Sequence, residues 1–133
     1  MRAEKVIRSL LMAASGVTAI VSTRCYAPPL KQGQTYPALL VEAVSIAPIP
    51  TIDASASYRL VRARIQVTAY AADLSTVKSL VEAVRVACDY KHGTIAEVSV
   101  ASVLCELVGP DEYVEGLYLY RQLVDFYVTL KEE

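Results

Sequence analysis

The segment Tyr58-Arg-Leu-Val-Arg-Ala-Arg-Ile-Gln-Val-Thr-Ala-Tyr-Ala71 decides the fold, because its side chains alternate between apolar and polar. Successive side chains of a strand point to opposite faces of a sheet, so a period of two is typical of a strand with one buried face. One face carries Val61, Ala63, Ile65, Val67 and Ala69, and the other carries Arg62, Arg64, Gln66 and Thr68. The segment therefore predicts a long, half-buried strand.

A helix is predicted directly after this strand. Asp73 or Ser75 can accept a hydrogen bond from the first free amides of a helix. Apolar residues then recur at helical spacing, separated by polar ones, and form the stripe Val77, Leu80, Val81, Val84 and Cys88. Because such a stripe covers one side of a helix, we expect it to pack against the sheet.

The remaining segments supply one more helix and three more strands. Residues 3–14 carry an apolar stripe at helical spacing, and Gly16 is typical of a helix stop. Strands are predicted over 38–46, 95–108 and 117–130, and loops over 23–37, 47–57, 90–94 and 109–116. The order α-β-β-α-β-β predicts an α+β fold, in which a mainly antiparallel four-stranded sheet carries two helices on one face.

Length and composition favour one folded domain over residues 1–133. A chain of 133 residues has the size of a single ordinary domain. With 54% apolar and 20% charged residues, it has enough apolar surface to form a core. The high apolar fraction fits either a tightly filled monomer or a subunit interface.

The charge balance disfavours nucleic acid and anionic membranes as partners. The chain has 13 basic and 14 acidic residues. Polar residues interrupt the most apolar stretch, 9–23, so no membrane-spanning segment is expected. Basic residues before this stretch imitate a secretory signal. Arg24 and Pro28 lie on either side of the crude cleavage site, and both disfavour cleavage by a signal peptidase. We therefore expect that the N-terminus is not cleaved and remains in the cytoplasm.

Few side chains are suited to catalysis. His92 is the only histidine and lies in a predicted exposed turn. Cys25, Cys88 and Cys105 are widely spaced, which predicts buried free thiols and neither disulfides nor a zinc site. A dyad of Cys88 with His92 is disfavoured because Cys88 belongs to an apolar helical stripe. We therefore expect no enzyme, no catalytic residue, no cofactor and no metal.

Tyrosines and an acidic loop are candidate interface features. Nine tyrosines accompany one Phe and no Trp, and Tyr118, Tyr120 and Tyr127 fall on the last strand. Tyrosine is enriched at interfaces, although these residues can also rim a small core. Asp111, Glu112 and Glu115 lie together in a predicted loop, where a solvated tip is favoured over a calcium site.

Arginines on the long strands form the last candidate group. Arg62 and Arg64 share the polar face of their strand, where they can pair with a neighbouring subunit or face solvent. The full set of candidate interface residues is Arg62, Arg64, Asp111, Glu112, Glu115, Tyr118, Tyr120 and Arg121.

Several segments together resemble a known family. They are Ser15-Gly-Val-Thr-Ala-Ile-Val-Ser-Thr-Arg-Cys-Tyr-Ala-Pro-Pro, Gln34-Thr-Tyr-Pro-Ala-Leu-Leu-Val-Glu, Arg64-Ile-Gln-Val-Thr-Ala-Tyr-Ala-Ala-Asp and Tyr120-Arg-Gln-Leu-Val-Asp-Phe-Tyr-Val. In this order, spanning nearly the whole chain, they resemble the small tail-completion, or tail-terminator, proteins that join head and tail in long-tailed bacteriophages.

The resemblance implies a structural virion protein without a cofactor. It implies a ring, hexameric in the family, that caps the tail tube, stops its polymerisation and receives the head connector. The implied partners are other copies of the chain, the tail tube protein and the connector or neck protein. The protein would be assembled in the host cytoplasm and reside in the tail or neck. Two alternatives are a neck or minor tail adaptor and a regulatory oligomer that binds a small molecule.

Overall fold

The computed structural model describes residues 2–28, 35–49 and 59–132. These residues form three α-helices, one short 3-10 helix and seven strands. The helices are α1 (Arg2–Ala13), α2 (Ser15–Val21), α3 (Leu74–Cys88) and η1 (Glu115–Leu117). The strands are β1 (Cys25–Tyr26), β2 (Ala38–Ile49), β3 (Arg59–Ala71), β4 (Lys91–Ile95), β5 (Val98–Val108), β6 (Glu112–Val114) and β7 (Leu119–Glu132).

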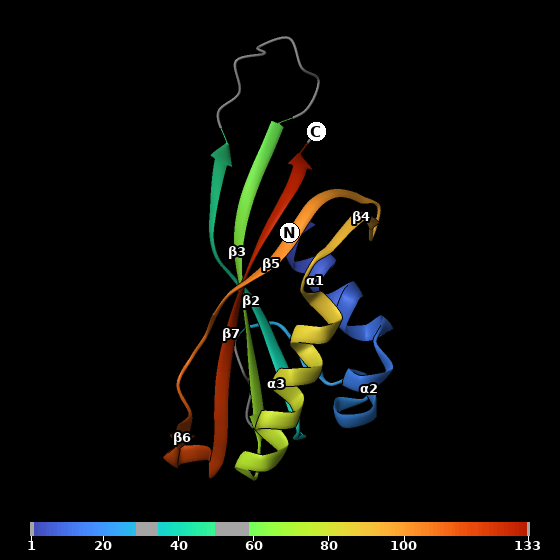
Figure 1. Cartoon of the computed structure of the whole chain (residues 1–133). Coiled ribbons are helices and arrows are strands. Elements are labelled where there is room, and N and C mark those ends of the chain that lie inside the picture. The colour runs from blue at the N-terminus through green and yellow to red at the C-terminus, as the bar shows by residue number, and fades with distance from the viewer. Residues whose placement is uncertain (1, 29–34, 50–58, 133) are drawn as a thin grey trace.

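All described strands join one twisted sheet that the helices cover on one face (Figure 1). The strand order is β1-β2-β3-β7-β5-β4, and β6 pairs with β7. Only the short β1 runs parallel to its neighbour β2, and the other pairings are antiparallel. The α+β class and the mainly antiparallel sheet are therefore confirmed, whereas the prediction of four strands and two helices is wrong.

The missed strands are short and lack the usual sequence signals. Residues 90–94 were predicted as a loop because of Gly93, but β4 forms here and pairs with β5. The turn that joins them places Ala96 and Glu97 at positive φ, 52° and 66°. Such hairpin turns usually contain Gly, Asn or Asp, so this sequence gives no signal of one. Strands β1 and β6 likewise lie in segments predicted as loops.

The missed helix begins next to the predicted stop. The chain breaks at Ala14, which is extended, and Gly16 lies inside α2. A Cβ atom on Gly16 would stand 3.9 Å from the Cβ of Ala83. This is an ordinary van der Waals distance, so α2 packs beside α3 at Gly16 without requiring a glycine there, and Gly16 does not end a helix.

The core lies between the sheet and the helices. Strand β3 supplies the predicted apolar face, and its residues Ile65 and Val67 stand opposite Phe126 and Val124 of β7. Helix α3 begins as predicted, because Asp73 accepts a hydrogen bond from the backbone N–H of Thr76 at 2.7 Å. This bond also lowers the pKa of Asp73. The other predicted cap, Ser75, lies within the helix.

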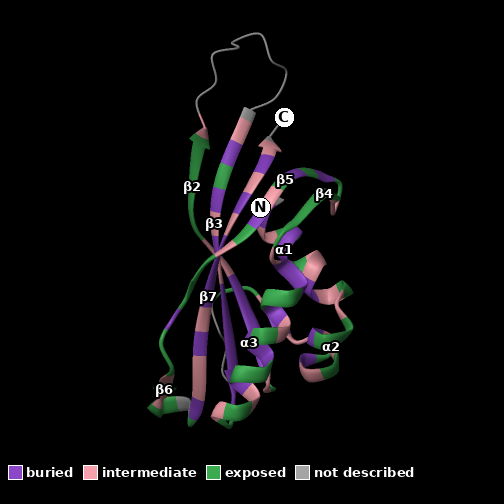
Figure 2. Ribbon diagram, viewed as in Figure 1, coloured by how far each residue is buried: buried purple, intermediate pink, exposed green. Residues whose placement is uncertain are grey.

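The chain has two dissimilar ends. At one end β2 and β3 extend past the helix layer (Figure 1). The loop predicted over 47–57 is wrong at residues 47–49, which belong to β2, and residues 50–57 lie outside the described residues. Residues 44–48 of β2 are exposed there (Figure 2). The other end holds β6, η1 and the start of β7. None of the helices described is long and apolar enough for a membrane span.

Candidate interaction surfaces

The eight candidate interface residues fall on two separate surfaces. Six of them, Asp111, Glu112, Glu115, Tyr118, Tyr120 and Arg121, gather around β6, η1 and the start of β7. Arg62 and Arg64 lie elsewhere, on the face of the sheet that carries no helix. The two groups cannot belong to one small contact patch.

Tyrosines dominate the first surface, which we call the tyrosine end. Strand pairing sets Tyr113 opposite Tyr120, and their rings meet edge to face with centroids 5.0 Å apart. Tyr118 was predicted on the last strand, but it lies directly after η1 and before β7, in a left-handed conformation with φ 54°. This residue is 77% exposed. Tyr113 is 49% exposed. Large amphipathic side chains therefore project from this end into solvent.

More tyrosines reach the same end from distant segments. A small cluster on the helix-free face buries Leu40, Tyr70 and Leu119, with Tyr26 and Tyr36 packed against it. The rings of Tyr36 and Tyr70 lie 6.1 Å apart. Sequence reasoning missed these tyrosines because the fold brings together residues that are distant along the chain. The tyrosine end thus comprises Tyr26, Tyr36, Tyr70, Tyr113, Tyr118 and Tyr120.

Charged side chains at this end are largely paired within the chain. Arg121 donates to Glu112 at 3.1 Å, and Lys78 of α3 forms an ion pair with Asp111. Glu115 is exposed. Across the part of the chain that the structure describes, no group of three His, Cys, Asp or Glu residues is arranged to hold a metal ion. Asp111 and Glu112 thus link β6 and its approach to α3 and β7 through two partly exposed ion pairs.

The arginines of β3 are also engaged within the chain. Both Nε and Nη2 of Arg64 donate to Oδ2 of Asp125, at 3.2 and 2.5 Å. Asp125 is only 1% exposed, and the bond raises the pKa of Arg64. The guanidinium of Arg62 lies 3.9 Å from the ring centroid of Tyr127. Arg64 thus balances a buried carboxylate, while Arg62 remains exposed on a tyrosine ring.

The thiols and the histidine are poorly placed for chemistry. Cys25 and Cys88 are buried free thiols, as predicted, and Cys105 is partly buried. Burial raises the pKa of Cys88 to about 12 and also raises the pKa of Cys25. His92 is exposed, but it belongs to β4 and not to a turn. A thiol that stays protonated at neutral pH is a poor nucleophile, so the Cys88 and His92 dyad has no support.

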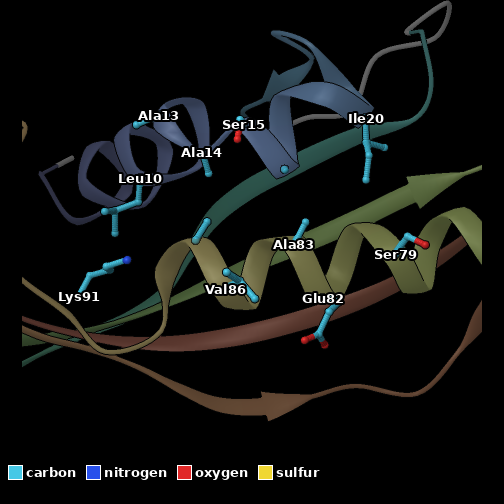
Figure 3. Close-up of a pocket in the computed structure, with 12 residues that line it drawn as sticks. Leu10, Ala13, Ala14, Ser15, Ile20, Ser79, Glu82, Ala83, Val86 and Lys91 are labelled. Atoms are coloured by element: carbon cyan, nitrogen blue, oxygen red, sulfur yellow. The ribbon is translucent and has the colours of Figure 1, made fainter.

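An apolar groove of about 840 Å³ is lined by residues of α1, α2 and α3 (Figure 3). Leu10, Ala14 and Ile20 line one side, and Ala83 and Val86 line the other. Polar groups come from Ser15, Ser79, Glu82 and Lys91 at intervals along it. The groove thus lacks the converging polar groups that usually orient a small ligand.

The sequence profile described as "Tail completion protein gp17" matches residues 5–130, nearly the whole chain. The chain belongs to the tail completion protein gp17 family. This is a family of structural tail proteins and not of enzymes. The predicted resemblance is therefore confirmed, together with the assignment to a virion tail. The shortage of groups suited to catalysis agrees with this membership.

A solved virion structure has the same fold as this tail completion protein. A chain of the "Virion of native gene transfer agent (GTA) particle" superposes with a TM-score of 0.66. The identity is 19%, and the match covers 97% of this chain and 94% of the other. No curated protein matches the chain. At this identity the likeness shows that the α+β fold is used inside a phage-like particle.

Proposed function

We propose that this tail completion protein forms a ring on the end of the tail tube, and that the ring is hexameric, as the family resemblance implies. There it stops polymerisation of the tube and offers a joining surface to the head connector. Membership of the tail completion family supports the place of action. The likeness to a chain of a phage-like virion supports a role as a part of the particle.

The tyrosine end is the observation that carries the proposal. A ring on a tube must contact one partner along the axis on each side, and copies of itself laterally. Exposed aromatic side chains on a rigid base are typical of interface hot spots. Tyr113 and Tyr118 are such side chains, and β6, η1 and β7 hold them in place. We assign the tyrosine end to one axial contact.

Electron microscopy of particles that lack this chain tests the role. Overlong tails are expected if the ring stops tube growth, and these tails should not carry heads. Tails of normal length without heads would instead support a neck or minor adaptor that joins finished parts. Tails of normal length that carry heads would contradict both roles.

A further inference from the structure

We propose that residues 44–49 of one copy insert into the groove between α1, α2 and α3 of the next copy. This proposal rests on the proposed ring. It assigns each side of the lateral contact between neighbouring copies to a named surface. The donor is an apolar segment at the edge of the sheet. The acceptor is the groove beside Val86 (Figure 3).

The donor segment is exposed and carries no charge. Strand β1 pairs only with Leu39 and Leu40 of β2, so the edge beyond them has no described neighbour strand. Val44 is 47% exposed and Ile46 is 40% exposed, and residues 43–49 contain no charged side chain. Exposed apolar residues in such a run are typical of an interaction site.

Side chains, and not the strand backbone, are suited to make the contact. A bulge between Ala43 and Ser45 interrupts the regular register of β2. Pro48 has no N–H to donate to an added strand. Both features are devices that prevent edge strands from pairing with other chains. The apolar side chains of Val44 and Ile46 remain available for a partner.

The acceptor groove offers matching apolar surface. Val86 is 69% exposed although it is a valine on a helix that packs on the core. A second hollow of about 280 Å³ lies on α3 beside Val86. It is lined by Tyr90, which is 78% exposed, and by the charged residues Glu82, Arg85 and Asp89. Val86 and Tyr90 are thus the two large exposed apolar residues of this hollow. In Figure 3, α3 carries Ala83 and Val86 opposite Leu10 and Ile20.

The charges of the groove favour an uncharged occupant. Glu82 and Lys91 bring opposite signs to its margins, so the groove has no net charge that would select an ionic ligand. An uncharged apolar strand suits this surface. Because donor and acceptor are different surfaces of the same chain, the contact repeats head to tail, and such contacts close into rings.

Paired cysteine variants test the contact directly. Ile46→Cys and Val86→Cys are made separately in the full-length chain, mixed, and assembled at high concentration or on tail tubes. A disulfide needs Cα atoms about 4.4–6.8 Å apart, so gentle oxidation should link only residues in direct contact. We expect cross-linked dimers from the mixture and none from either variant alone. The single variants also control for the partly buried Cys105.

Leu104→Cys provides the matched control. Leu104 is an apolar strand residue that is 44% exposed, close to the exposure of Ile46, but it lies on β5 on the helix-free face. Mixed with Val86→Cys, it should give no cross-link. Equal yields from Ile46→Cys and Leu104→Cys would overturn the proposed contact.

A charge placed in the groove gives a second measurement. Val86→Glu should weaken ring association by roughly tenfold or more, because the loss of one buried apolar side chain lowers an association constant by at least that factor. Leu104→Glu should not weaken it. Circular dichroism and thermal unfolding of both variants verify that the monomer remains folded, as expected for exposed positions.

The outcomes of these experiments distinguish the proposal of this lateral contact from the proposal of a ring. Rings that form normally with Val86→Glu and show no Ile46 to Val86 link would overturn the contact and leave the ring proposal intact. A wild-type chain that remains monomeric at every concentration and on tail tubes would overturn both. A link in the mixture together with weakened association by Val86→Glu would support both.

Discussion

The side chains on the two faces of strand β3 are buried by different kinds of neighbours. On the face toward the helices, Ile65 and Val67 are buried by apolar neighbours. On the other face no helix is present, yet Thr68 and Tyr70 are also buried, and β7 adds the buried Asp125. The alternation of the sequence correctly predicted which side chains share a face. It wrongly indicated that the whole polar face meets water, because long side chains on neighbouring strands cover one another there.

The largest effect is expected on the helix-covered face. Phe126 is fully buried between the sheet and the helices. Phe126→Ala should lower the free energy of unfolding by about 3–5 kcal/mol, because it removes apolar contacts and leaves a cavity. Chemical denaturation at neutral pH measures this loss. A change near zero would mean that the core does not depend on this face of β7.

A smaller effect is expected on the helix-free face. Arg64→Leu removes the partner of Asp125 and leaves a buried carboxylate without its cation. The loss should be less than that of Phe126→Ala, because the side chain of Arg64 is 36% exposed and solvent screens the pair.

The double variant Arg64→Leu, Asp125→Leu is the control for this pair. It removes both charges, so it should recover much of the stability that Arg64→Leu loses. A double variant as unstable as the sum of two independent changes would show that the two residues are not coupled. In that case the helix-free face would be held by packing alone.

The start of α3 offers a pH-dependent effect that is smaller again. The pKa of Asp73 is lowered in the folded chain by the N–H of Thr76. The resulting stabilisation is present above the unfolded pKa of Asp, about 3.9, and is lost as the pH falls through the lower folded value. Asp73→Asn can still cap the helix but cannot titrate.

Unfolding curves between pH 2 and pH 7 check this expectation. Asp73→Asn should reduce the acid sensitivity of the chain while keeping the helix cap, whereas Asp73→Ala should lose stability at neutral pH. Equal acid sensitivity of the wild type and Asp73→Asn would assign acid unfolding to other carboxylates.

Local patterns predicted the elements that local residues determine. The alternation of β3, the stripe of α3 and its cap at Asp73 need only neighbours in sequence. The β4 and β5 hairpin was missed because Ala96 and Glu97 adopt positive φ without glycine. The pairing of Arg64 with the buried Asp125 was missed because the two residues are 61 positions apart along the chain. Tyr118, Tyr120 and Arg121 were predicted together since they are close in the sequence, whereas Tyr26, Tyr36 and Tyr70 meet only in the folded chain.

Substitution of either of two exposed tyrosines should have almost no effect on stability, which allows their roles in assembly to be compared. Tyr118 and Tyr90 are 77% and 78% exposed, and both have positive φ, 54° and 63°. Asparagine tolerates this conformation better than most residues. Tyr118→Asn and Tyr90→Asn should therefore change the unfolding free energy by less than about 0.5 kcal/mol. Their consequences for assembly should nevertheless differ.

The tyrosine end and the groove predict different defects. Tyr118→Asn should leave ring formation intact and weaken attachment along the tail axis, because Tyr118 projects from the end assigned to an axial partner. Tyr90→Asn should weaken ring formation, because Tyr90 borders the hollow beside Val86. Native mass spectrometry reports the ring, and electron microscopy of complemented particles reports head attachment. If both variants lose the ring equally, the axial and lateral contacts do not occupy separate surfaces of this chain.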